Sequence, residues 1–476
     1  MEKTKITIGY APTRRNLFSI KEALYYRDEI VKKIKGLTDA EIIDIDDINE
    51  EGLMFSENDL PAIISKFKHA GVDGIFCPHC NFGTEDLVAK LGYAIGKPVL
   101  LWGPRDHAPN PDGSRERDTQ CGLFATGKVL RRFNVPYTYL PNDTVDSLSF
   151  TRGYQGFVAV CGVVKAARKI NILQIAPRPG DFWTMIVNEG ELLEKFNVHV
   201  SPVTLYSVVS GVEKNLAEKP PEYQIVLKDL KDNMDCGDVP EDSVEKIAAL
   251  KTVILSMVKE KNCTAIGIQC WTDLQDAIGI MPCVVNGLFC DIGIPMVCEV
   301  DIHGAISAIL LQEAAMRTTP IFFADLTVRH PSNDNAELLW HCGNFPQSLA
   351  KDPGARKMGR HFVFATHCPG TANWELKEGE LTICRFDGDN GKYTLFIGEG
   401  HTCEGPMTQG TYVWLEVKDW LMWEKVLVEG PYVHHCAGIH AHVGPILHEA
   451  CKYIPGLEPD AVDPTDAEIA GWWLGR

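Results

Sequence analysis

The sequence predicts an α/β protein with two consecutive parallel-sheet, Rossmann-like domains followed by a β-rich, antiparallel and barrel-like C-terminal domain. Short apolar runs alternate with amphipathic helical stretches through the first third of the chain, and the alternation starts again at INILQIAPRPGD, residues 170–181. Beyond residue 360 the apolar runs become short and are separated by Gly, Asp and Asn. The alternation is typical of parallel sheets covered by helices, and the later spacing is typical of antiparallel pairing.

The first domain is expected at residues 1–169. Its strands are predicted at 6–10, 41–46, 74–78 and 98–103, and a helix-like segment at 150–169 leads into the next domain. The second domain is expected at 170–350. Its strands are predicted at 199–205, 264–270, 295–300 and 321–326, and its helices at 240–261 and 304–317.

The third domain is expected at residues 351–476. It begins with KDPGARKMGR, residues 351–360, a charged stretch with Gly and Pro that is typical of a linker. Its short strands are predicted at 361–367, 380–388, 393–400 and 411–417, and a final helix at 444–454.

Composition limits the classes of partner. The chain has 476 residues and a formal charge of −18, which argues against a nucleic-acid or anionic-membrane partner because both need a basic surface. No apolar run reaches the roughly 18 residues of a membrane span, and the N-terminus lacks a signal-peptide pattern. The sixteen cysteines are scattered, which favours reduced, buried thiols and a cytoplasmic protein.

CPHCNFGTED, from Cys77 to Asp86, has two interpretations. A C-x-x-C between a strand and a helix is the context of a redox pair, but no second C-x-x-C completes a zinc site. The alternative is a ligand-cleft turn at the carboxyl end of a parallel strand. The second interpretation is favoured, and a redox role for Cys77 and Cys80 stays open.

Three acids follow two apolar strands in the second domain. Glu299 and Asp301 end the strand in PMVCEVDIHGA, and Asp325 ends the strand in IFFADLTVRH. Asp301 is well placed to cap the helix that begins near Gly304, whereas Glu299 has no such role. Acids at the same level of neighbouring parallel strands would converge, so Glu299 and Asp325 are predicted to share a site.

Two carboxylates joined by a histidine suit a divalent cation with open coordination positions. The acids suit Mn²⁺ or Mg²⁺, and an imidazole shifts the preference toward Mn²⁺, Co²⁺ or Fe²⁺. The histidine must come from elsewhere in the chain. HHCAGIHAH, residues 434–442, is the first candidate source, and His341 in LLWHCGNFP is the second.

These motifs resemble those of the L-fucose isomerase / L-arabinose isomerase superfamily, and the similarity extends along the whole chain. VCEVDIHGAISAI implies that Glu299 is the catalytic, metal-binding glutamate, and FFADLTVR implies that Asp325 is the metal-binding and second catalytic acid. His434-His435 followed by AHVG implies that His435 is the metal histidine. The pair His434-His435 is more like the arabinose isomerases, in which a segment similar to WHCGNFP carries a further metal histidine, so His341 could be a fourth ligand.

The resemblance also implies substrate contacts and an assembly. IGIQCWTD implies a substrate-contacting Gln269, and IGYAPTRRN implies that Arg14 or Arg15 reaches the sugar of an adjacent subunit. His341 and His434 are expected to contact the substrate as well. Members of the superfamily are trimers or hexamers, so a homo-oligomer with active sites near subunit interfaces is expected.

The implied reaction is aldose–ketose isomerisation through an enediol, on a pentose, hexose or 6-deoxyhexose of the L-fucose/D-arabinose or L-arabinose/D-galactose type. Mn²⁺, or another divalent cation such as Co²⁺ or Mg²⁺, is the expected cofactor. Two alternatives stay open: a metal-dependent hydrolase or lyase on the same scaffold, and a non-catalytic sugar-binding protein.

Overall fold

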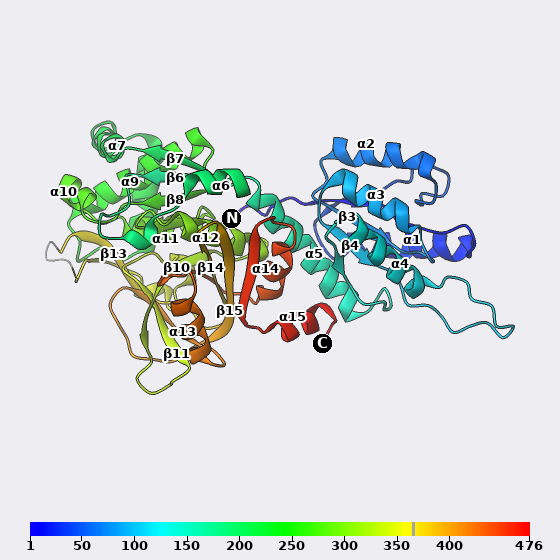
Figure 1. Ribbon diagram of the computed structural model, residues 1–476. Helices are drawn as coiled ribbons and strands as arrows, with labels where there is room; N and C mark the ends of the chain where they lie inside the picture. The colour runs from blue at the N-terminus through cyan, green and yellow to red at the C-terminus, as the bar shows by residue number, and fades with distance from the viewer. Residues whose placement is uncertain (364–366) are drawn as a thin grey trace. The chain divides into compact units, whose positions relative to one another are not determined.

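The structure, a computed structural model, describes residues 1–363 and 367–476, and the predicted strand at 361–367 lies partly outside these ranges. The chain forms two compact units (Figure 1). We call Thr4–Lys165, Pro445–Ile454 and Thr465–Arg476 the N-terminal unit. We call Met1–Lys3, Ala166–Gly444 and Pro455–Pro464 the barrel unit. Among the described residues, every helix is too short or too polar to cross a membrane.

The N-terminal unit contains a five-stranded parallel sheet in the order β2-β1-β3-β4-β5. Its strands are β1 (Thr7–Tyr10), β2 (Glu41–Ile43), β3 (Gly74–Pro78), β4 (Val99–Trp102) and β5 (Thr138–Tyr139). Its helices are α1 (Ile20–Lys35), α2 (Leu60–Ala70), α3 (Glu85–Ile95), α4 (Thr119–Arg132), most of α5 (Leu148–Ala167), most of α14 (Gly444–Cys451) and α15 (Asp466–Trp473). The first parallel sheet is therefore confirmed.

Local sequence explains how these helices form. The Ser19 side chain caps α1 by accepting a hydrogen bond from the backbone N–H of Glu22. The buried residues of α1 recur every three or four positions, which is the spacing of one helical face. They are Ala23, Tyr26, Ile30 and Ile34.

The barrel unit begins with a second parallel sheet in the order β7-β6-β8-β9. Its strands are β6 (Asn171–Ile175), β7 (His199–Val203), β8 (Ala265–Ile268) and β9 (Met296–Cys298). The helices of this region are α6 (Glu189–Phe196), α7 (Leu205–Glu218), α8 (Pro221–Asn233), α9 (Glu241–Lys261), α10 (Asp273–Ile278), α11 (Cys283–Asp291) and α12 (Ile302–Ala314). Every residue of α12 is buried, which is the environment expected for a helix that is apolar on all sides.

The third sheet closes into a barrel. It has the order β12-β13-β16-β11-β10-β17-β14-β15-β18, and a further pairing joins β15 to β16. Its strands are β10 (Ile321–Arg329), β11 (Ala336–His341), β12 (Lys357–Arg360), β13 (Pro369–Glu375), β14 (Glu380–Asp389), β15 (Lys392–Cys403), β16 (Thr411–Glu416), β17 (His435–Ile439) and β18 (Leu457–Asp463). The ring from β16 through β11, β10, β17, β14 and β15 is antiparallel throughout. The predicted barrel-like region is therefore confirmed, and α13 (Trp420–Glu429) packs with it.

The prediction that 321–326 is a parallel strand beside 295–300 is wrong. That segment belongs to β10, which pairs antiparallel with β11 and β17. One face of β10 contacts α12, and the other contributes Phe322 to the core shared with Leu339 and Ile383. A strand covered on both faces is apolar throughout, so its sequence looks the same as that of a strand in a parallel sheet.

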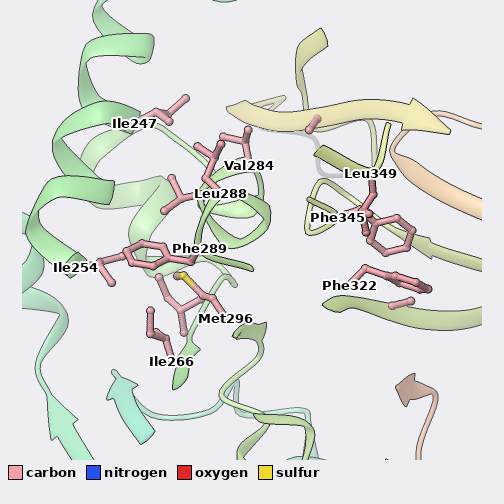
Figure 2. Close-up of a cluster of buried hydrophobic side chains, with 14 of the residues drawn as sticks. Ile247, Ile254, Ile266, Val284, Leu288, Phe289, Met296, Phe322, Phe345 and Leu349 are labelled. Atoms are coloured by element: carbon pink, nitrogen blue, oxygen red, sulfur yellow. The ribbon is translucent and has the colours of Figure 1, made fainter. Parts of the chain in front are cut away.

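One hydrophobic core joins the second sheet to the barrel. Figure 2 shows this cluster of side chains, which come from α9, α11, β8 and β9 and reach Phe322 and Phe345 on the barrel side. The expected boundary at residue 350 therefore crosses a continuous core, and β10 and β11 lie before it although they pair with strands that follow it. Short 3₁₀ helices lie at Glu57–Asp59, Trp183–Met185, Gln347–Leu349 and Pro353–Ala355.

Glu337 on β11 is a buried carboxylate with one oxygen that accepts no hydrogen bond from the described residues around it. It is 4% exposed, and its Oε2 has no hydrogen-bond partner among the described residues. Burial raises the pKa of Glu337 from 4.5 to about 7, against the opposing charge of Arg329 and with the help of Glu424.

Replacing Glu337 with Gln should stabilise the protein in a pH-dependent way. The unfolded chain ionises this group near pH 4.5 and the folded chain only near pH 7, so the native protein loses stability between these values and regains none above them. We expect E337Q to exceed the wild type in unfolding free energy by up to about 3 kcal/mol at pH 8, and by much less at pH 5. Urea unfolding at both pH values measures this, and a difference that does not change with pH would contradict it.

Candidate metal centre

The backbone is strained where β9 meets α12. Glu299 and Val300 have φ values of 60° and 58°, in the left-handed region that a β-branched residue rarely adopts. Gly267 on β8 makes room for this path, because a Cβ on that glycine would lie 3.3 Å from the Cα of Val300. The Glu299 side chain is buried at the end of β9, so the strain holds a carboxylate in the interior.

Asp301 connects three elements through one carboxylate. It caps α12 by accepting a hydrogen bond of 2.8 Å from the backbone N–H of Gly304. Its Oδ2 lies 2.9 Å from Nδ1 of His435 on β17, and both of its oxygens pair with the guanidinium of Arg385 on β14. Burial alone raises the pKa of Asp301, but the charge of Arg385 and the His435 hydrogen bond hold it well below its usual range.

Arg385 is clamped between two aspartates. Its Nε donates a hydrogen bond of 2.8 Å to Oδ2 of Asp387, and its side chain is 1% exposed. Asp387 also lies 2.8 Å from Nδ1 of His303 and accepts a hydrogen bond of 2.8 Å from the backbone N–H of Gly388. Every charge in this chain of contacts therefore has an opposite charge or a donor beside it.

Asp325 and His435 are neighbours on adjacent strands of the barrel. They are cross-strand partners on β10 and β17, so their side chains lie on one face of the sheet. Nε2 of His435 is 3.4 Å from Oδ1 of Asp325 and 3.3 Å from Oε2 of Glu299. His341, at the end of β11, brings its Nε2 to 4.0 Å from Oδ1 of Asp325.

Four donor atoms thus converge without being satisfied. They are buried, and none has a hydrogen-bond partner among the described residues: Glu299 Oε2, Asp325 Oδ1, His341 Nε2 and His435 Nε2. A ligand atom of His434 also lies within 4.8 Å of those of Glu299 and His435. Carboxylate oxygens and imidazole nitrogens with no thiolate fit Mn²⁺ or a similar divalent cation, so these residues could hold one.

The protonation of this cluster reflects its crowding. Burial raises the pKa of Asp325 to about 7 against the opposing charge of His435, and the nearby charges of Glu299 and Asp301 act in the same direction as burial. Burial lowers the pKa of His435, but its hydrogen bond to Asp301 and the nearby carboxylates of Glu299 and Asp325 raise it to about 10. In the metal-free protein, the proton on His435 therefore supplies the positive charge that the acids need.

The two histidines differ in which nitrogen is free. A carboxylate only accepts hydrogen bonds, so Nδ1 of His435 carries a proton and donates to Asp301. The lone pair of Nε2 becomes available to a ligand when this second nitrogen loses its proton. Nδ1 of His341 instead accepts a hydrogen bond of 2.9 Å from the backbone N–H of Cys342. Burial lowers the pKa of His341 well below its usual range, so it stays neutral with its proton on Nε2. His435 is thus arranged as a ligand and His341 as a hydrogen-bond donor.

The other predicted site residues lie in different places. Gln269 follows β8 at the carboxyl edge of the second sheet, and its Oε1 is buried with no hydrogen-bond partner in the described ranges. His434 packs its ring 4.3 Å from that of His435. Arg14, in the N-terminal unit, donates two hydrogen bonds to Glu51 and lies over the ring of Phe55, so its guanidinium is already engaged in its own unit.

The cysteine pair gives no sign of redox chemistry. Cys77 and Cys80 are buried free thiols, and burial raises the pKa of Cys77 to about 12. Arg385 is the contributor that the sequence prediction missed. Its signal was an arginine inside the apolar run ELTICRFDG, where a charge needs a buried partner.

Comparison with known proteins shows similarity to sugar isomerases. Residues 9–168 match the family model of the fucose/sulfoquinovose isomerase N-terminal domain, and residues 339–456 match that of the L-fucose isomerase C-terminal domain. Proteins named sulfoquinovose isomerase from Priestia aryabhattai and Alkalicoccus urumqiensis are each 26% identical over 86% of this chain, and cover 89% and 91% of their own lengths. One of the same name from Clostridium sp. (strain MSTE9) is 22% identical over 59% of this chain and 62% of its own.

Two aspartates, the half-buried Asp325 and the buried Asp387, should respond oppositely to replacement by Asn in the metal-free protein. Asp325 faces other acids with an unpartnered oxygen, so D325N should leave stability unchanged or raise it at pH 8, where the carboxylate is charged. Asp387 is fully partnered, so D387N should lower it by about 3 kcal/mol. Urea unfolding in the presence of a chelator measures both, and a large loss of stability in D325N would show that its carboxylate is satisfied.

Proposed function

The chain belongs to the L-fucose isomerase / L-arabinose isomerase superfamily as a divergent member, and from this premise we propose that it is a metal-dependent aldose–ketose isomerase. The observation that supports this most is that Nε2 of His435 lies 3.3 Å from Oε2 of Glu299 and 3.4 Å from Oδ1 of Asp325, with all three atoms buried and without hydrogen-bond partners among the described residues. A protein that only bound sugar would not need two carboxylates there, one of them held by strained backbone.

The reaction moves a carbonyl group from C1 to C2 of an open-chain sugar. A proton leaves C2 and one is added to O1, which gives an enediol. O2 then loses its proton while C1 gains one, which gives the ketose. Glu299, Asp325 and His435 would hold the cation, Mn²⁺ or a similar ion such as Co²⁺ or Mg²⁺, which supplies Lewis-acid stabilisation of negative charge on the sugar oxygens.

The protein's own residues move the proton. Each carboxylate has two oxygens, and only one oxygen of Glu299 and one of Asp325 is among the convergent donors. The remaining oxygen of one of these acids takes the proton from C2 and returns it to C1 as general base and then general acid. The Asp325 side chain is 21% exposed and that of Glu299 is 8% exposed, so Asp325 is the more accessible to substrate.

Other side chains orient the sugar. Nε2–H of His341 is directed toward Asp325, where it would donate a hydrogen bond to a substrate oxygen. Gln269 offers its unpartnered amide oxygen to a hydroxyl group, and His434 borders the same space. A role for Arg14 in an adjacent subunit, and the homo-oligomer that it requires, remain predictions.

The first substrate to test is sulfoquinovose, a 6-deoxy-6-sulfo aldohexose, because the curated relatives carry its name. We expect the Mn²⁺-loaded protein to form the corresponding ketose, measured beside L-fucose, D-arabinose, L-arabinose and D-galactose. Turnover of any of these sugars to its ketose supports the proposal. Absence of ketose from all of them, with cleavage of an ester or aldol instead, would favour a hydrolase or lyase.

Replacing Glu299 with Gln tests the acid pair. E299Q keeps the size of the side chain but removes its charge, so kcat on the active sugar should fall by about 10²–10⁴-fold. Glu378, whose side chain is 73% exposed and pairs with Lys351, provides the matched control, and E378Q should keep wild-type kcat. Wild-type turnover in a folded E299Q protein would refute the role of Glu299.

Metal binding should distinguish the role of His435 from that of His341. Mn²⁺ should raise the melting temperature of the wild type, because an ion that binds only the native state stabilises it. H435Q should lose most of this increase, whereas H341Q should keep it, since His341 has its lone pair on the wrong nitrogen. Differential scanning fluorimetry with Mn²⁺ and with chelator measures the difference. Equal loss in both variants would make His341 a fourth ligand.

A further inference from the structure

We infer that Asp301, held by Arg385, is a positioning residue that makes His435 a metal ligand, an inference that rests on the proposed metal centre. Asp301 would not touch the cation or the sugar. It acts through Nδ1 of His435, 2.9 Å from its Oδ2, on the opposite side of the imidazole from the convergent donors.

The geometry leaves the imidazole little freedom. The side chains of His435, Asp301 and Arg385 are each 1% exposed, so water does not compete for their hydrogen bonds. The contact with Asp301 fixes both the rotation of the ring and the position of its proton. A carboxylate hydrogen-bonded to a ligating histidine also raises the electron density available at the other nitrogen.

Arg385 keeps the Asp301 carboxylate charged and in place. Its two terminal nitrogens contact the two oxygens of Asp301, and its Nε contacts Asp387 on the other side. The Asp301–Arg385 pair is therefore a rigid fork inside the protein, with geometry set by the β14 backbone.

Helix capping alone does not explain this arrangement. Asparagine caps a helix about as well as aspartate, and the cap requires only one oxygen that accepts from Gly304. Capping does not require a negative charge, whereas the contacts of the buried Arg385 with both oxygens of Asp301 favour the charged carboxylate. Asp301 also lies two residues after Glu299. The same short segment therefore carries the predicted ligand Glu299 and, through Asp301, orients the predicted ligand His435.

The test uses two Asp→Asn variants of the intact protein. D301N keeps the cap and the shape but loses the charge that faces His435. D387N removes a charge from the same arginine without touching His435, and so is a matched control. The dissociation constant for Mn²⁺, from isothermal titration calorimetry, should rise about 10–100-fold in D301N and less than about threefold in D387N. At saturating Mn²⁺, the KM for the sugar should be close to wild type in D301N.

Other outcomes would overturn the inference. Wild-type Mn²⁺ affinity in D301N would show that Asp301 does not act on His435. An equal loss in D301N and D387N would assign the effect to general loosening around Arg385. If D301N does not fold, R385K, which keeps a cation but loses the fork, should still weaken Mn²⁺ binding severalfold, and unchanged affinity there overturns the proposal. A wild-type protein that binds no divalent cation would instead refute the metal centre itself, together with this inference.

Discussion

The buried contact between the Asp301 carboxylate, His435 and Arg385 is the constraint on which the candidate site depends. It joins the start of α12 to β17 and β14, so it ties the second parallel sheet to the barrel. A buried ion pair contributes little net stability over apolar packing, and breaking it leaves an uncompensated charge. We therefore interpret the main role of this contact as orienting His435 toward Glu299 and Asp325, and its contribution to stability as secondary.

The site itself opposes folding. Left-handed backbone at Glu299 and Val300 costs on the order of 1–3 kcal/mol for each residue, and the converging donors have no partners within the described chain. The large core that α9 and α11 build with β8, β9 and the barrel offsets this cost (Figure 2). Unsatisfied, strained groups that persist inside a well-packed unit are typical of a functional site, because only an external ligand satisfies them.

Barrel closure determines which residues meet. Because β10, β11 and β17 are adjacent and antiparallel, Asp325, His341 and His435 reach one edge of the barrel from segments far apart in the sequence. The sequence predicted that Glu299 and Asp325 share a site, and the structure brings both to His435, but part of the reasoning was wrong. It placed 321–326 in the parallel sheet, whereas Glu299 ends a parallel strand and Asp325 lies on an antiparallel one.

By itself, the sequence determined the α/β character of the first two sheets and the β-rich C-terminal region, because periodicity is a local property. The choice of Glu299, Asp325 and His435 stays a prediction, made from acids at strand ends and from a family resemblance. Only the tertiary structure decided that β10 joins the barrel, that Arg385 pairs with Asp301, and that His341 and His435 present different nitrogens. Strand partners and histidine tautomers are set by neighbours distant in the sequence. The residue pattern of a single segment therefore cannot predict which strands pair or which histidine nitrogen carries the proton.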